Sequence, residues 1–372
     1  MSGFYLSPQR DSSLKSSGGL ARAGRLLRIP VFSLLGCMLL CLSACSSYAA
    51  VSQSQTPVVQ NVNGFGTAAN HVHAMLALPG QNLLLATHYG LYRSDNDGKS
   101  WIGPNATMSN MMSSSLSSSP INRQRVYVLV EHSLTTQSGG IGLYTSVDGG
   151  VTWKYTSPAT QTGKMYTVVA GNRSANEVYA YVATKGAQGL LVSEDGGTHF
   201  SSPGALPFGS ILGILPLPGK PGQLLVYSND GVAHSSDGGA HWQVINSFSA
   251  AIYNMSISGT SNTIYASGDQ GIFISQDGGK SFTLVDGNDH YSALTAVGGL
   301  PETVYGKTGR LIYKSVDGGH TWKALPSLQG NLENLVPDPQ SPSRLFLSLS
   351  YPSGVELYNG QSGSWTSLTP KA

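Results

Sequence analysis

The chain has 372 residues, of which 21 are basic and 19 acidic, so its formal net charge is only +2. This balance excludes the strongly basic surface that nucleic-acid binding requires. All three cysteines lie within the first 45 residues, so the rest of the chain has none for a disulfide framework or a thiolate metal site. The 46 glycines and the few charged residues suit short strands joined by tight turns.

The N-terminal residues are arranged like an export signal. Five basic residues between positions 10 and 28 precede an apolar run from Ile29 to Leu42, and the sequence LSAC at 42–45 follows it. This tetrapeptide resembles the bacterial lipobox, in which the cysteine becomes the lipidated first residue of the mature protein. The alternative is an uncleaved membrane anchor, but the 16 residues from Ile29 to Ala44 are fewer than the ~18–20 that a spanning helix needs.

Three regions therefore follow from the sequence. We expect residues 1–44 to be a signal peptide, residues 45–70 to be the lipidated Cys45 and a flexible tether, and residues 71–372 to be the folded domain. The protein should be exported and held by its lipid on the outside of the cell membrane or in the periplasm. Without the leader, 16 basic and 18 acidic residues remain, so the basic balance belongs to the export signal. The segment PVVQNV at 57–62 is either an extra strand that closes the domain or plain linker.

From residue 71 onward a short motif recurs. Five full copies are SVDGGVTW, SEDGGTHF, SSDGGAHW, SQDGGKSF and SVDGGHTW, which end at positions 153, 200, 242, 282 and 322. SDNDGKSW at 94–101 is a sixth copy, and YNGQSGSW at 358–365 keeps only the final aromatic residue. We call the stretches 94–101, 146–153, 193–200, 235–242, 275–282, 315–322 and 358–365 the repeat turns. Their final aromatic residues are 52, 47, 42, 40, 40 and 43 positions apart, and a period near 40 is typical of a radial repeat fold.

Each repeat contains four short strand patterns separated by turn residues. In the first repeat, HVHAMLAL, NLLLATH, GLYRS and SWIG follow one another from His71 to Gly103. No long segment has the 3.6-residue apolar period of a helix. The sequence therefore predicts an all-β fold, a seven-bladed β-propeller whose blades are four-stranded antiparallel sheets with the repeat turns between the third and fourth strands.

The motif resembles the Asp-box, or BNR, repeat of sialidases, sortilin-type receptors, xyloglucanases and the photosystem II assembly propeller. The resemblance covers residues 71–369 and is specific for the propeller but not for a function, because unrelated sites occur on one fold. We assign a structural role, turn hydrogen bonding or packing between blades, to Asn96, Asp148, Asp195, Asp237, Asp277 and Asp317 and to Trp101, Trp153, Phe200, Trp242, Phe282, Trp322 and Trp365.

In a four-stranded meander the repeat turns and the turns between the first and second strands share one face. The turns between the second and third strands, with the connectors between blades, share the other, and in enzymes of this resemblance the chemistry lies there. We call it the B–C face. The predicted binding residues on it are Tyr89, Glu131, His132, His290, Tyr291 and Arg310. Two long connectors, 104–112 and 131–140, are either binding loops or variable surface.

Two further chemistries, metal binding and glycoside hydrolysis, have candidate residues on this face. His71 and His73 alternate on a strand as metal ligands do, but no cysteine or carboxylate motif accompanies them, so we predict neither a metal nor any other cofactor. Glycoside hydrolysis needs two carboxyl groups, and the candidates are Glu131, Asp289 and Glu333.

We expect a binding or scaffold module that is monomeric, contacts the membrane through its lipid, does not bind nucleic acid, and holds a protein or glycan partner. The alternative is a glycoside hydrolase acting on a neutral polysaccharide or a sialidase-like glycan. The sialidase reaction implied by the resemblance would need three converging arginines, and only Arg310 lies near the B–C face.

Overall fold

The computed structural model describes residues 70–134, 139–246, 248, 251–259, 261–287, 291–298, 302–350 and 353–369. They belong to the compact unit Gln55–Ala372. Their strands form seven antiparallel sheets, and each sheet is made of strands that are consecutive in the chain. The predicted seven-bladed β-propeller is therefore confirmed, and blades 1–7 are numbered in chain order.

The bounds of the strands show how regularly the pattern repeats. Blade 1 contains β1 (Val72–Leu78), β2 (Asn82–Thr87) and β3 (Gly90–Ser94), and blade 2 contains β4 (Met111–Ser118), β5 (Val126–Ser133), β6 (Gly142–Ser146) and β7 (Lys154–Pro158). Blade 3 contains β8 (Thr167–Ala170), β9 (Val178–Tyr181) and β10 (Leu190–Ser193), and blade 4 contains β11 (Gly213–Pro216), β12 (Leu224–Ser228), β13 (Gly231–Ser235) and β14 (Gln243–Val244). Blade 5 contains β15 (Ile252–Ile257), β16 (Ile264–Gly268), β17 (Gly271–Ser275) and β18 (Thr283–Asp286). Blade 6 contains β19 (Ala293–Gly298), β20 (Thr303–Thr308), β21 (Leu311–Ser315) and β22 (Lys323–Ala324). Blade 7 contains β23 (Leu332–Pro337), β24 (Arg344–Leu349), β25 (Gly354–Asn359) and β26 (Ser364–Ser367). The helices in the described part of the chain are short: η1 (Ala106–Met108), α1 (Ala159–Thr162) and η2 (Ala183–Gln188), which is kinked at Gly186.

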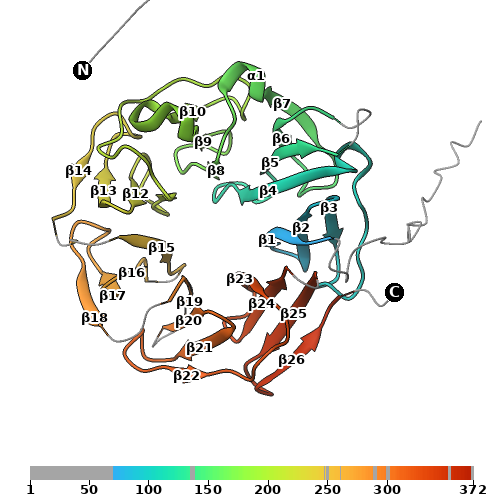
Figure 1. Ribbon diagram of the computed structural model, residues 1–372, viewed down its shortest axis with the longest axis vertical. Helices are drawn as coiled ribbons and strands as arrows, with labels where there is room; N and C mark the ends of the chain where they lie inside the picture. The colour runs from blue at the N-terminus through green and yellow to red at the C-terminus, as the bar shows by residue number, and fades with distance from the viewer. Residues whose placement is uncertain are drawn as a thin grey trace, which may run out of the picture. The chain divides into compact units, whose positions relative to one another are not determined.

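The seven sheets follow one another around a ring, and β1, β4, β8, β15, β19 and β23 lie on its inner side (Figure 1). Every described strand pair within a blade is antiparallel, as in β24 with β23 and β25. Because the strands alternate in direction, all the turns that follow second strands reach the same face of the ring. This is the B–C face.

Blades 1 and 3 differ from the prediction because they have three strands. Their fourth segments pair with the sheet only through single bridges, Arg93 with Ile102 and Val192 with Ser201. Pro104 and Pro203 follow these bridges within two residues. Proline has no N–H group to extend a ladder, which explains why neither segment continues as a strand.

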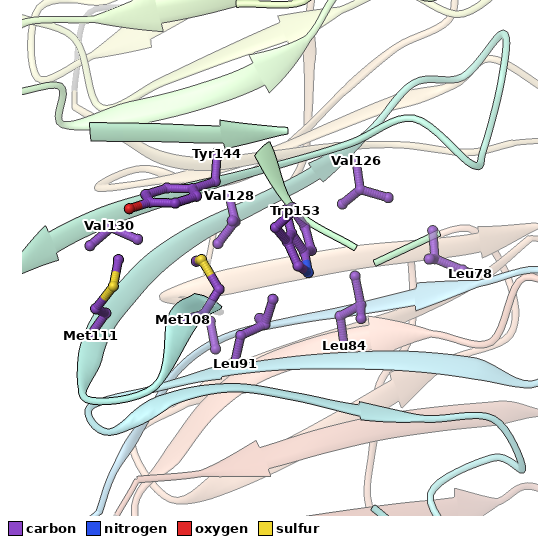
Figure 2. Close-up of a cluster of buried hydrophobic side chains, with 11 residues drawn as sticks. Leu78, Leu84, Leu91, Met108, Met111, Val126, Val128, Val130, Tyr144 and Trp153 are labelled. Carbon is purple, nitrogen blue, oxygen red and sulfur yellow. The ribbon is translucent and has the colours of Figure 1, made fainter. Parts of the chain in front are cut away.

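The core lies between neighbouring blades. Leu84 and Leu91 of blade 1 pack with Val126, Val128 and Trp153 of blade 2 in one buried cluster (Figure 2). Similar clusters combine side chains of blades 3 and 4 and of blades 6 and 7. Apolar burial stabilises a domain roughly in proportion to the area removed from water, so each blade depends on its neighbours for its stability.

The ring closes where the two ends of the described chain meet, between blades 1 and 7. The indole Nε1 of Trp101 donates to the carbonyl oxygen of Leu368 at 2.9 Å, and Arg344 pairs with Asp97 at 3.1 Å. Trp101 also belongs to a buried cluster with Phe346 of β24. Side-chain contacts thus join the two blades; the segment 57–62, predicted as a possible closing strand, lies outside the described residues.

Among the described residues, no helix is long and apolar enough to cross a membrane. The predicted signal peptide and Cys45 lie outside those residues.

Candidate functional site

Backbone hydrogen bonds place the repeat turns beside the turns that join first and second strands. Gly149 N–H donates to the Gln124 carbonyl at 2.9 Å, and Gly238 N–H donates to the Gly222 carbonyl at 2.8 Å. On the B–C face, His88 N–H donates to the His71 carbonyl at 3.0 Å. The two faces of the ring are therefore built from different sets of turns.

Within the repeat turns, the serine and aspartate side chains bond to their own turn. Ser146 donates to Asp148 at 2.7 Å and accepts the Gly150 N–H at 2.8 Å. Asp148 accepts the N–H and the hydroxyl of Thr152 at 2.9 and 2.5 Å. Asp195, Asp237, Asp277 and Asp317 accept bonds in the same way. In the first copy, the amide oxygen of Asn96 accepts the Ser100 N–H at 2.9 Å.

These bonds favour the ionised aspartates. Burial by itself would raise the pKa of Asp237, but hydrogen bonds from the backbone and ring of His241 outweigh it and lower the pKa to about 2. The Thr321 hydroxyl is the main cause that lowers the pKa of Asp317, also to about 2. Because the carboxylate oxygens bond within their own turns, the repeat turns are a structural element of this fold.

The aromatic residues of the repeat turns pack against the preceding blade. Trp153 lies in the cluster that contains Leu84 of blade 1, and the indole of Trp365 donates to the Pro326 carbonyl at 2.9 Å. Phe200, Trp242, Phe282 and Trp322 also belong to or pack against buried clusters.

On the B–C face, the structure brings together three predicted binding residues of blades 1 and 2. Tyr89 follows β2, and its ring lies 5.2 Å from the ring of His88. Glu131 and the exposed His132 lie near the end of β5, where His132 lies opposite Met112 of the inner strand β4. These side chains therefore come from adjacent blades at the same edge of the ring.

Two of the candidate carboxyl groups lie beside lysines of a neighbouring blade. Glu131 lies 3.6 Å from the ammonium group of Lys164. Glu333 is exposed at the start of β23, where Lys307 donates to its backbone carbonyl at 3.1 Å. Burial lowers the pKa of Lys307, and Glu333 partly opposes the shift. Asp289, the third candidate, and His290 lie outside the described residues.

Tyr291 is not a surface binding residue, contrary to the prediction. Its side chain is 2% exposed, and its ring lies 4.6 Å from the ring of Trp322. The neighbouring sequence gave no sign of this, because the aromatic contact comes from a repeat turn of the same blade but 31 positions away. Arg310 lies in the exposed turn between β20 and β21, on the B–C face as expected.

The long connector at 104–112 is also part of the core. Met108 and Met111 are fully buried in the cluster between blades 1 and 2 (Figure 2). Unbranched, polarizable methionine fills irregular gaps of this kind. The described part of the other connector ends at Leu134 and resumes at Gly139, where Gly140 accepts the Tyr144 hydroxyl at 3.0 Å.

The structure adds a group of histidines to the same region. His71, His73 and His88, which we call the histidine cluster, are half-buried, and each offers a ring nitrogen that lies within 4.8 Å of the others. The ring centroids of His71 and His73 are 4.5 Å apart, and those of His71 and His88 are 4.8 Å apart. The sequence predicted no metal here, because no cysteine or carboxylate motif accompanies His71 and His73.

Burial and neighbouring histidines favour the neutral form of two members of the cluster. Burial first, and then neighbouring His71 and His88, lower the pKa of His73 to about 4, while Glu131 acts in the opposite direction. Burial, with His71 and His132, also lowers the pKa of His88. A neutral imidazole is the form that binds a metal ion.

Two further features of the domain do not include the predicted binding residues. Arg173, Arg125 and Arg344 bond to Glu177, Asn176 and Asp338 beside the repeat turns. A cavity of about 550 Å³ lies between the outer edge of blade 1 and the repeat turn of blade 2, lined by Tyr92, Pro104 and Val151 among others. The cavity is also lined by Asn105 and Ser109 of the connector 104–112, in which Asn110 donates its N–H to the Tyr89 carbonyl.

No protein-family model matches this sequence. No curated protein matches it either. Solved structures do resemble it in fold.

A GH74 xyloglucanase from Xanthomonas campestris superposes with a TM-score of 0.65 at 14% identity, covering 82% of this chain and 55% of its own. YCF48 bound to D1 peptide gives a TM-score of 0.56 at 16% identity, covering 77% of this chain and 92% of its own. YCF48 from Cyanidioschyzon merolae gives 0.57 at 18% identity, covering 79% and 97%. The chain thus spans about half the length of the xyloglucanase, and at these identities the likeness shows a shared propeller fold.

Proposed function

We propose that this protein is an exported, lipid-anchored Asp-box propeller that binds a protein or glycan partner on its B–C face. The observation that carries the proposal is the set of exposed aromatic side chains on this face. Tyr166, just before the inner strand β8, is 54% exposed, and Tyr253, on the inner strand β15, is 44% exposed. The half-buried Tyr89 and the Glu131–Lys164 ion pair belong to the same face.

The chemistry of these side chains suits recognition. Tyrosine offers a rigid apolar ring and a polar hydroxyl, so it contributes contact area at a small cost in conformational entropy. A half-exposed ion pair contributes little to stability but selects a partner with complementary charge. Together they fit a peptide segment with mixed polarity or the faces of sugar rings.

The fold likeness supports both classes of ligand. One neighbour in fold is a propeller bound to a peptide, and others are GH74 enzymes, one of them a xyloglucanase. We place binding ahead of hydrolysis because the two described candidate carboxyl groups lie beside Lys164 and Lys307. A hydrolase would need two carboxyl groups about 5–9.5 Å apart across the scissile bond.

The test compares partner binding by variants of the two faces. The full chain in detergent and a Tyr89→Ala/Tyr166→Ala/Tyr253→Ala variant are used to recover partners from solubilised membranes and from a set of neutral polysaccharides. The control, Val147→Ser/Val316→Ser, changes exposed apolar residues of two repeat turns. We expect the tyrosine variant to lose the partner at least tenfold and the control to retain it.

Two results would contradict the proposal. One is equal recovery by both variants, given that both have the circular dichroism spectrum of the unchanged chain. The other is enzymatic activity: the unchanged chain releases reducing sugar from a polysaccharide, and Glu131→Gln or Glu333→Gln does not. That result would establish the hydrolase alternative.

A further inference from the structure

We propose that the histidine cluster binds one divalent transition-metal ion through ring nitrogens of His71, His73 and His88. Zn²⁺ fits best because three imidazoles and one open position form one of its known ligand sets, and imidazole also suits Cu²⁺ and Ni²⁺. This site does not depend on the identity of any protein or glycan partner.

Two unpartnered buried atoms point to a ligand. Within the part of the chain that the structure describes, Nε2 of His73 and Nδ1 of His88 are buried and have no hydrogen-bond partner. A buried polar atom without a partner costs about 1–3 kcal/mol. Such atoms are therefore rare unless water or an ion completes them. Two unpartnered ring nitrogens within one cluster of three imidazoles are what a cation site without its cation would contain.

The backbone brings the three rings together by a local irregularity. The pairing of β1 with β2 shifts between Val72 and Ala74, so His73 is an extra residue in a β-bulge. Bulges redirect side chains and occur next to functional sites. The backbone carbonyl of His73 accepts the Asn334 amide of blade 7 at 3.4 Å, and the backbone bond from His88 to His71 holds the other two members at the end of the same hairpin.

An acidic side chain and an aromatic ring flank the cluster. Glu131 interacts with His73 in the direction that stabilises positive charge there. The ring of Tyr89 packs edge-on against the ring of His88. Since the three members are half-buried rather than enclosed, a fourth coordination position is left for water or for a group of a bound molecule.

A modest contraction completes the site. With Zn–N bonds of about 2.0–2.1 Å in a tetrahedron, ligand nitrogens lie roughly 3.3 Å apart. The nitrogens of the cluster lie within 4.8 Å of one another, so they must approach by up to about 1.5 Å. Rotations about the side-chain bonds of half-buried histidines provide that movement without a change in the strands.

The experiment is a titration of the full chain in detergent, without a histidine tag and with any free cysteine alkylated, since thiolates also bind Zn²⁺. Calorimetry with Zn²⁺ gives the stoichiometry and Kd, and the visible absorption of Co²⁺ reports its coordination. The variants are His71→Ala, His73→Gln and His88→Gln. The matched controls are His199→Ala and His241→Ala, which change exposed histidines of the repeat turns.

We expect one Zn²⁺ per chain and a Tm that rises with the Zn²⁺ concentration. Each cluster variant should weaken binding at least ~10-fold, since even changes outside the ligand set of known sites cost about 10–100-fold, and the controls should bind like the unchanged chain. Circular dichroism identifies any variant that fails to fold, and the glutamine variants keep the size of the side chain. The proposal is overturned if no Zn²⁺ binds below about 100 μM, or if folded His73→Gln and His88→Gln bind it as tightly as the unchanged chain.

Discussion

Replacing Trp101 with alanine should open the ring at its closure. Trp101 is 7% exposed, packs in a cluster with Phe346 and Val355 of blade 7, and donates its indole N–H to Leu368. Truncation of a buried Trp costs about 3–5 kcal/mol, and the lost hydrogen bond, about 0.5–1.5 kcal/mol, is part of that figure. The loss is large because Trp101 contributes both apolar packing and a hydrogen bond to the contact between the first and last blades.

Urea unfolding followed by far-UV circular dichroism measures this effect. Trp365→Ala is the matched control, because the indole of Trp365 also bonds to a backbone carbonyl but is partly exposed; it should cost roughly half as much. The reasoning is refuted if Trp101→Ala lowers the free energy of unfolding by less than about 1 kcal/mol or by no more than Trp365→Ala does.

Three further predictions concern the repeat turns and the anchor. Gly150→Ala should lower the Tm, because the φ angle of Gly150 is +91° and a Cβ atom there would lie 2.7 Å from the Leu84 side chain. The control Gly209→Ala places its Cβ atom in open space and should leave the Tm within experimental error of the unchanged chain. Equal Tm values for the two variants would contradict this prediction. The pKa of Asp237 is about 2 in the folded protein and about 3.9 in the unfolded chain, so ionised Asp237 stabilises the fold above pH ~4 and this stabilisation is lost as the pH falls towards 2. In Asp237→Asn, the free energy of unfolding should therefore depend less on pH, as measured by denaturation between pH 2 and 5. Cys45→Ser should abolish attachment of fatty acid and release the protein from membranes, as seen by mass spectrometry and fractionation; unchanged fractionation would favour an uncleaved anchor.

The sequence was sufficient to predict the fold because each repeat carries its own signals. Glycines at positive φ, as in Gly149 and Gly150, and a terminal aromatic residue mark each turn, and both effects are local. The three-stranded blades were missed although Pro104 and Pro203 were visible in the sequence. Their effect on a ladder depends on which backbone groups face the sheet, and the pairing register decides this.

The candidate site could be predicted only in part, because its contacts are not local. The face was inferred from strand direction, and Tyr89, Glu131 and His132 do lie together on it. Tyr291 was misplaced because Trp322, whose ring packs against it, follows three strands later. The third member of the histidine cluster, His88, is 15 positions from His73, and only the hairpin pairing brings them together. Histidines at alternate positions of one strand, opposite a histidine at the end of the next, are the signal that would have revealed the cluster.

The central claim, that the protein works through its B–C face, is tested most directly by a photocrosslinking scan in living cells. A photoreactive amino acid is placed one position at a time at Tyr89, Tyr166 and Tyr253 on this face and at Val147 and Val316 on the repeat-turn face. We predict adducts with a defined partner, or with a glycan, from the three tyrosine positions and at most background from the two valine positions. Adducts of equal yield from both faces, or from the valine positions alone, would contradict the account.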